Sequence, residues 1–275
     1  MDGIIDNLIN AINTWNEKLA EIWVLLTQSP QEFKGGHIWD IIVKINGALM
    51  AIGIALLVLF FAVGMVKTCS SFTDVKKPEH AVKLFVRFAI ARALVVYGME
   101  IMMKLFEIIQ GILSTIMNAV GVGMATSTTL PKEIIDAVDD CGFMASIPLW
   151  AVSLLGGIFI TVLAFVMILT VYGRFFKLYM YTAISPIPFS CCAGESTQSI
   201  MIAFTKSYIG VCMEGVIIVL ACVIFSAFAG APPVDVNASA VSMVWTYIAE
   251  LIFNMLILVG TVKMSDRIVK EMMGL

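Results

Sequence analysis

Ionisable side chains within apolar stretches are the residues of this sequence that could do chemistry. We select five of them as candidates for a hydrated channel or for a polar seam between helices: Glu100, Lys104, Glu107, Glu214 and Glu250. A charged group at the centre of a lipid bilayer costs about 2.5 to 3.5 kcal/mol on insertion scales, so each requires a partner, a proton or water. On a helix Glu100, Lys104 and Glu107 share one face and can neutralise one another. Four carboxylates would repel a phosphate backbone, so nucleic acid could pass here only if burial protonates some of them or if they lie off its path.

Five basic residues form a second set of candidates, for the inner mouth of a channel: Arg87, Arg92, Arg174, Lys177 and Lys206. Such a mouth could meet an anionic strand or the acidic surface of an ATPase. The general excess of basic residues on the cytoplasmic side of membranes, and their attraction to anionic lipid, explain the same set without any contact to nucleic acid. The sequence leaves both interpretations open.

Pro186 and Pro188 are candidates for a gate or hinge. Two prolines at this spacing remove two backbone donors and break a helix. Irregular backbone at membrane depth is tolerated only where protein or water covers it, so we expect a re-entrant or interfacial elbow over residues 178–194. Broken helices line cavities in transport proteins, and a rigid kink is the alternative role.

Neither metal nor cofactor chemistry is indicated. The six cysteines form no CxxC pair, and neither of the two histidines has cysteine or carboxylate neighbours at the spacing of a ligand set. Phosphate-binding, dinucleotide-binding and hydrolase motifs are absent as well. We therefore predict no catalytic residues, no metal, no cofactor and no enzymatic activity.

The amino-acid composition indicates whether the helices that carry these candidate residues lie in water or in lipid. Of the 275 residues 60% are hydrophobic and only 13% are charged, and the mean hydropathy is +0.97. A soluble chain is about one quarter charged, so a soluble fold is excluded. The pattern predicts an all-α polytopic membrane protein with about five transmembrane helices, an N-terminal amphipathic helix and the proline-broken elbow.

Apolar runs locate the helices. The clearest run has no charge between Lys44 and Lys67 and provides the roughly 20 apolar residues that a span requires. We expect spans at about 45–66, 93–117, 146–173, 208–229 and 241–262, in a single transmembrane domain of residues 41–275. Residues 121–142 are expected to form an outer loop with an acidic cluster.

The N-terminal segment, residues 1–40, is expected on the outer side of the membrane. Apolar residues recur at helical spacing over residues 3–26, which indicates an amphipathic helix. Trp15 and Trp23 lie on its apolar stripe. This stripe could lie at the lipid interface or pack against another helix, and the sequence does not distinguish the two.

Basic residues set the expected orientation. With the N-terminus outside and the C-terminus cytoplasmic, most of the 17 basic residues fall on the inner side, including Lys76, Lys77 and a short amphipathic tail that carries Lys263, Arg267 and Lys270. We therefore predict a multi-pass protein of the cell (plasma) membrane.

Several segments of the sequence point to one protein family more specifically than the hydropathy pattern does. One run opens with Tyr172, Gly173, Arg174, Phe175, Phe176 and Lys177 and closes with Ser185, Pro186, Ile187, Pro188 and Phe189. It resembles a segment of the TrbL-like conjugal transfer proteins, the polytopic membrane channel subunits of type IV secretion systems in Gram-positive bacteria. Similar matches occur at residues 28–30, 35–39, 77–81 and 262–267.

The resemblance implies a non-enzymatic subunit of a mating channel. Such a subunit is a homo-oligomer in the cell membrane, in contact with lipid, and works with cytoplasmic ATPases and other secretion subunits. It helps to move single-stranded DNA with its relaxase during conjugation of a mobile genetic element. The alternative function is a secondary transporter that uses intramembrane carboxylates. Transporters usually have two repeated halves, and the elbow has no counterpart in residues 45–120.

Overall fold

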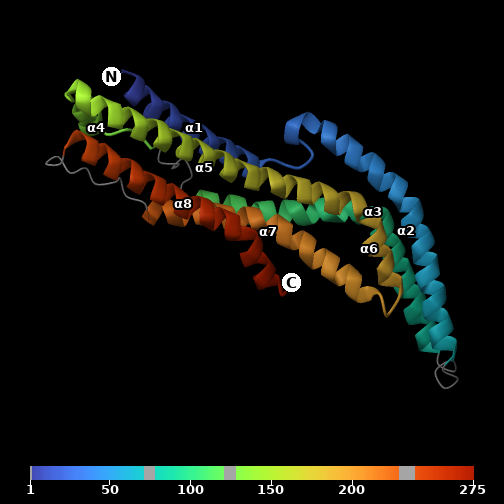
Figure 1. Ribbon diagram of the computed structural model, residues 1–275. Helices are drawn as coiled ribbons and strands as arrows, with labels where there is room; N and C mark the ends of the chain where they lie inside the picture. The colour runs from blue at the N-terminus through green and yellow to red at the C-terminus, as the bar shows by residue number, and fades with distance from the viewer. Residues whose placement is uncertain (1, 71–77, 121–127, 229–238) are drawn as a thin grey trace. The chain divides into compact units, whose positions relative to one another are not determined.

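The structure is a computed structural model that describes residues 2–70, 78–120, 128–228 and 239–275. The described residues form helices and no strands, which confirms the all-α fold class (Figure 1). The elements are α1 (Asp2–Thr27), η1 (Phe33–Gly36), α2 (His37–Ser70), α3 (Pro78–Val120), α4 (Lys132–Asp139), α5 (Phe143–Ile184), α6 (Pro186–Ser190), η2 (Cys191–Ala193), α7 (Gln198–Phe228) and α8 (Ala240–Met273).

Among the described residues, four stretches are long and apolar enough to cross a membrane: Phe33–Val66, Ser146–Ile184, Gln198–Phe228 and Ala240–Met273. Four of the five expected spans lie within these stretches. Only residue 229, the last residue of the expected span 208–229, is not included, because it lies outside the described residues. The expected span 93–117 is helical within α3, but it is not among the four, because Glu100, Lys104 and Glu107 interrupt its apolar character. The protein is a polytopic helical membrane protein.

The chain divides into two compact units that are discontinuous in sequence. Unit 1 consists of Met1–Thr27, Leu113–Gly173 and Gly215–Ser265, and unit 2 of Gln28–Ile112, Arg174–Glu214 and Asp266–Leu275. The expected boundary between residues 40 and 41 stays a prediction, because the units group residues by mutual contact and not by position relative to a membrane.

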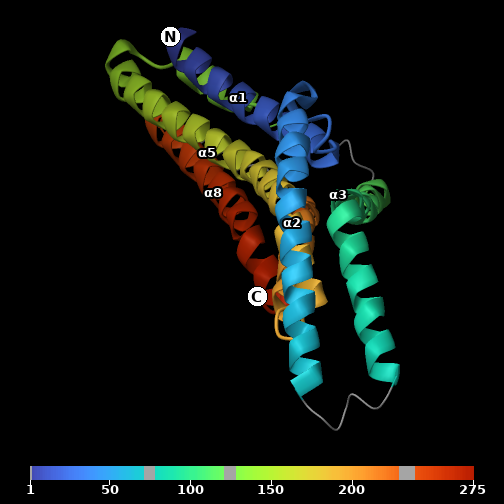
Figure 2. The ribbon, with the colours of Figure 1, turned by 90° about the vertical axis from the view of Figure 1, so that its right-hand side faces the viewer.

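In unit 1 the apolar stripe of α1 is buried. Trp15 is only 2% exposed. The two helices α1 and α5 run side by side (Figures 1 and 2), and a Cβ atom on Gly157 of α5 would lie 3.6 Å from the Cβ of Ala11. The stripe therefore packs against helices of its own unit, which answers the question that the sequence left open.

The expected outer loop over residues 121–142 contains the short helix α4. Ile134 and Val138 form its buried side. Glu133 and Asp136 of the predicted acidic cluster therefore lie on a helix, because the apolar residues four apart give this segment one face to bury. Residues 121–127 of the expected loop lie outside the described residues.

In unit 2 helix α2 exposes apolar side chains on much of its surface, among them Ile45, Ile52 and Leu59. An apolar surface of this kind suits contact with hydrocarbon. The aromatic ring of Phe61 lies 6.0 Å from the ring of Phe85 and 4.6 Å from that of Phe88, and both views show α2 beside the first half of α3 (Figures 1 and 2). The inner loop that was expected to contain Lys76 and Lys77 lies outside the described residues.

The expected elbow at residues 178–194 begins later than predicted. Helix α5 continues to Ile184, and the break consists of α6, η2 and the turn that precedes α7. Proline is tolerated in the first turn of a helix, where its missing N–H leaves no bond unmade. Pro186 therefore starts α6 and ends α5 two residues earlier, so the apolar residues 178–184 extend the predicted span. Similarly, the expected C-terminal tail continues α8 to Met273.

Candidate functional site

In unit 2 residues 28–39 pack against residues 174–189, and both ranges lie in segments that carry the resemblance. The Tyr179 hydroxyl donates a hydrogen bond of 2.7 Å to the carbonyl oxygen of Pro30. The rings of Phe33 and Phe175 stack with centroids 4.3 Å apart, and the Trp39 ring lies 6.5 Å from that of Tyr179. Segments about 150 positions apart in the sequence thus form one buried site.

Asn46 of α2 caps the end of α5. Its side-chain nitrogen donates to the Thr182 carbonyl oxygen at 2.7 Å and to the Ser185 hydroxyl at 3.0 Å. In an unbroken helix the N–H of residue 186 would bond to the Thr182 carbonyl, but proline has no N–H. Asn46 provides the missing donor and is only 3% exposed. Sequence reasoning missed this residue, although it is an isolated amide in the apolar run 45–66.

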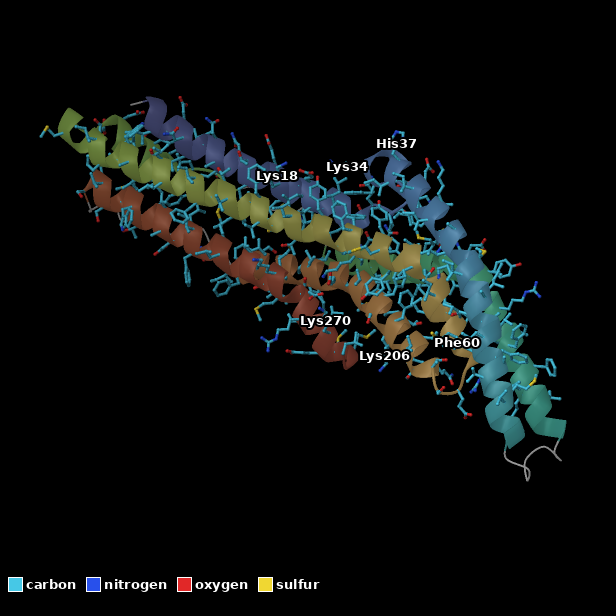
Figure 3. All side chains as sticks on the ribbon, turned by 45° about the vertical axis from the view of Figure 1, so that its right-hand side comes forward. Lys18, Lys34, His37, Phe60, Lys206 and Lys270 are labelled. Atoms are coloured by element: carbon cyan, nitrogen blue, oxygen red, sulfur yellow. The ribbon has the colours of Figure 1, made fainter. Side chains whose placement is uncertain are left out.

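Acidic and basic side chains from three helices meet elsewhere in unit 2. The Lys177 ammonium lies 2.7 Å from the Glu214 carboxylate and 2.8 Å from that of Asp266. The second oxygen of Asp266 lies 2.8 Å from the ammonium of Lys270, which Figure 3 labels on the last turns of α8. We call Lys177, Glu214, Asp266 and Lys270 the charge cluster. The Glu214 side chain is the most buried of the four, with 5% exposed.

The charge cluster joins residues that the sequence assigned to different roles. Glu214 was selected for a channel or polar seam and Lys177 for a basic mouth, and the structure pairs them. Asp266 was missed as a site residue. The signal for it was available, because it is an acidic residue between Lys263 and Lys270 and lies within a segment that carries the resemblance.

Arg174 is buried beside the charge cluster. It is 2% exposed, and its guanidinium carbon lies 5.8 Å from the ring centroid of Phe106 and 5.6 Å from that of Phe175. Its Nε and Nη1 atoms are buried without a hydrogen-bond partner among the described residues. Arg174 precedes Lys177 by three residues on α5, so it lies about one helical turn from the charge cluster. A buried guanidinium with unmade hydrogen bonds costs stability, which makes Arg174 a candidate for function.

Of the remaining candidates, Pro186 directly follows the α5 end that Asn46 caps, and the others make none of the contacts described above. The Lys104 ammonium lies 2.7 Å from the Glu107 carboxylate on the exposed face of α3. Glu100 and Arg92 are also exposed on α3. Lys206 is exposed on α7, and Glu250 is partly exposed on α8. Arg87 donates a 3.3 Å hydrogen bond to the Gln198 side chain, and Pro186 and Pro188 lie in α6. The roles of these residues as channel, mouth or hinge stay predictions.

Within the described ranges, no three His, Cys, Asp or Glu residues are grouped so that they could hold a metal ion. The described cysteines are free and buried: Cys141, Cys191, Cys192, Cys212 and Cys222. The contacts that define the site are ion pairs, aromatic rings and the capped end of α5.

The site and the long apolar helices define a polytopic membrane protein with charged side chains buried between its helices. Over residues 15–186 the sequence matches the family described as TrbL/VirB6 plasmid conjugal transfer like protein. The match covers more than half of the sequence, so the chain belongs to this family, whose members are components of conjugal transfer. This confirms the resemblance to TrbL-like proteins. No curated protein and no solved structure matches the chain.

Proposed function

We propose that this protein is a channel or scaffold subunit of a conjugative type IV secretion system. It helps to move single-stranded DNA with its relaxase across the cell membrane of a Gram-positive bacterium. It acts as a homo-oligomer, together with the cytoplasmic ATPases and other subunits of the system, and has no enzymatic activity of its own. Its N-terminus lies outside and its C-terminus in the cytoplasm.

The observation that carries this proposal is the packing of the family-like segments around Arg174 and Lys177. Burying charges among helices costs free energy, so the buried Arg174 and Glu214 point to a role beyond packing. Arg174 and the charge cluster together contain three basic and two acidic side chains. Because Glu214 is neutralised by Lys177, it presents less repulsion to a phosphate backbone than the sequence alone suggested.

A secondary transporter remains the competing function. A coupling carboxylate must release and rebind its ion or proton, whereas Glu214 is held by Lys177 within the protein. The match to a conjugal transfer family also favours the first function. Deleting the reading frame from a donor strain separates the two.

We expect the deletion to reduce conjugal transfer to background and the unchanged gene to restore it in trans, with donor growth unaffected. A transporter predicts the opposite result, in which transfer persists while uptake or efflux of a solute is lost. Measuring transfer frequency and growth on the same strains therefore decides between the two functions.

A further inference from the structure

A groove of about 440 Å³ opens in unit 2 between α3, η2 and the start of α7. One part of its lining is basic, with Lys83 and Arg87 one helical turn apart on α3. The rest is largely apolar and includes Ile90, Leu94 and Met201. A cationic end followed by an apolar channel matches the two parts of a phospholipid.

The position of the groove relative to the apolar run of α2 also suits a phospholipid. The ring of Phe61 packs on Phe85 and Phe88, and the first charged residue after Phe61 is Lys67. Since α2 and α3 run in opposite directions along each other (Figure 2), Lys83 lies toward the basic end of α2, and Leu94 toward the middle of its apolar run.

The stretch of α3 that lines the groove is about as long as one acyl chain. With a rise of 1.5 Å per residue, Lys83 and Leu94 are separated by about 16 Å along the axis of α3. Half of the hydrocarbon core is about 15 Å thick. A phosphate beside Lys83 would therefore allow its acyl chain to reach the level of Leu94.

The basic end of the groove carries charges that no ion pair compensates within the part of the chain that the structure describes. Arg87 donates to the neutral side chain of Gln198, and among the described residues no acidic group forms an ion pair with Lys83 or Arg87. Gln198 is also the first residue of the 31-residue helix α7. The N-terminal end of a long helix carries partial positive charge, which adds to the attraction for an anion.

We propose that this groove is a binding site for one anionic phospholipid. The phosphate lies between Lys83, Arg87 and the start of α7, and an acyl chain lies against Ile90, Leu94 and Met201. The proposal does not depend on the role of the protein in DNA transfer.

The test is a lipid titration of the purified full-length protein in neutral detergent, followed by native mass spectrometry. Phosphatidylglycerol is compared with phosphatidylcholine of the same acyl chains. Each basic residue near an anionic lipid contributes roughly five-fold in affinity. We therefore expect the K83Q/R87Q variant to bind phosphatidylglycerol on the order of 10- to 30-fold more weakly, while Lys132→Gln, a change at an exposed lysine of α4 that does not line the groove, leaves binding unchanged.

Two further variants separate loss of binding from loss of folding. Leu94→Trp fills the apolar part of the groove and should weaken phosphatidylglycerol binding with both charges in place, and Arg87→Lys keeps the charge and should retain binding. Equal affinity for the two lipids, wild-type affinity in K83Q/R87Q, or full displacement by inorganic phosphate would overturn the proposal. If K83Q/R87Q does not purify as a folded protein, Leu94→Trp and Arg87→Lys decide the question.

Discussion

Lys177 connects two carboxylates that come from different helices, Glu214 of α7 and Asp266 of α8. Glu214 is the most dependent on it, because its side chain is 5% exposed while that of Asp266 is 37% exposed. Removing one partner of a buried ion pair leaves an uncompensated charge in a medium of low polarity. Lys177 is thus expected to stabilise the contact between α5 and α7 in unit 2.

We predict that Lys177→Met lowers the free energy of unfolding by about 2 to 4 kcal/mol, near the values for breaking a buried pair. Thermal unfolding in detergent measures the change. The double variant K177M/E214Q should recover most of the loss, because it removes the buried charge as well. Lys270→Met is the control and should cost less than about 1 kcal/mol, as expected for an exposed pair. Equal losses in Lys177→Met and Lys270→Met would contradict this account.

Arg174 leads to the opposite expectation for stability. Because its Nε and Nη1 atoms are buried without partners, replacing it by methionine removes an unsatisfied charge and keeps contact with Phe106 and Phe175. We predict that Arg174→Met unfolds at the same temperature as the wild type or higher. Phe175→Ala, which removes a fully buried ring, should lose about 3 to 5 kcal/mol. A comparable loss in Arg174→Met would show that Arg174 is needed for packing.

The types of the site residues could be predicted, but their partners could not. Arg174, Lys177 and Glu214 stand out in the sequence because charges are rare in apolar runs. Their contacts join positions 37 and 89 residues apart, and hydropathy contains no information on which helices meet. Asn46 shows the same limit, since its role depends on a helix end that is 136 residues away.

At the scale of elements, the contact between α2 and α6 depends on the absence of a side chain at Gly53. A Cβ atom there would lie 2.8 Å from the carbonyl oxygen of Pro186 and 3.0 Å from its Cβ. The first of these is a backbone atom, so the two elements would have to move apart. Gly47 lies on the same helix, and no described atom beyond its chain neighbours and the adjacent helix backbone comes within 4 Å of its Cβ position.

These two glycines form a matched pair for mutation. We predict that Gly53→Ala destabilises the protein by about 1 to 3 kcal/mol through overpacking. Gly47→Ala should be neutral or stabilising by up to about 1 kcal/mol, because alanine favours the helix. Unfolding temperatures in detergent measure both. If Gly53→Ala were as stable as Gly47→Ala, the close contact between α2 and α6 would be wrong.

Helix extents were harder to predict than helix positions. The expected span 146–173 ends at the first charged region, yet α5 continues to Ile184, because Arg174 and Lys177 are accommodated by Phe106, Glu214 and Asp266 within the protein. A charge ends an apolar run in the sequence, but it does not end a helix when other residues of the fold neutralise or cover it. Only Pro186, which cannot donate a backbone hydrogen bond, ends α5.

For the whole molecule, the distribution of basic residues predicts that the C-terminus is cytoplasmic. A reporter fused after Leu275 that is active only in the cytoplasm should therefore be active, and one active only outside the membrane should be silent. Lys263, Arg267 and Lys270 make this the most basic end of the chain. The reverse pattern of activity would require an odd number of additional crossings or the opposite orientation.

The central claim is that the buried charges of Arg174 and Glu214 serve conjugal transfer. Arg174→Met tests it most directly, because this variant is expected to fold as stably as the wild type. The measurement is transfer frequency from a donor whose own copy is deleted and complemented by the variant, with the amount of protein in the membrane determined in parallel. We predict that transfer falls well below the wild-type frequency at equal amounts of membrane protein. Wild-type transfer by Arg174→Met would contradict the account.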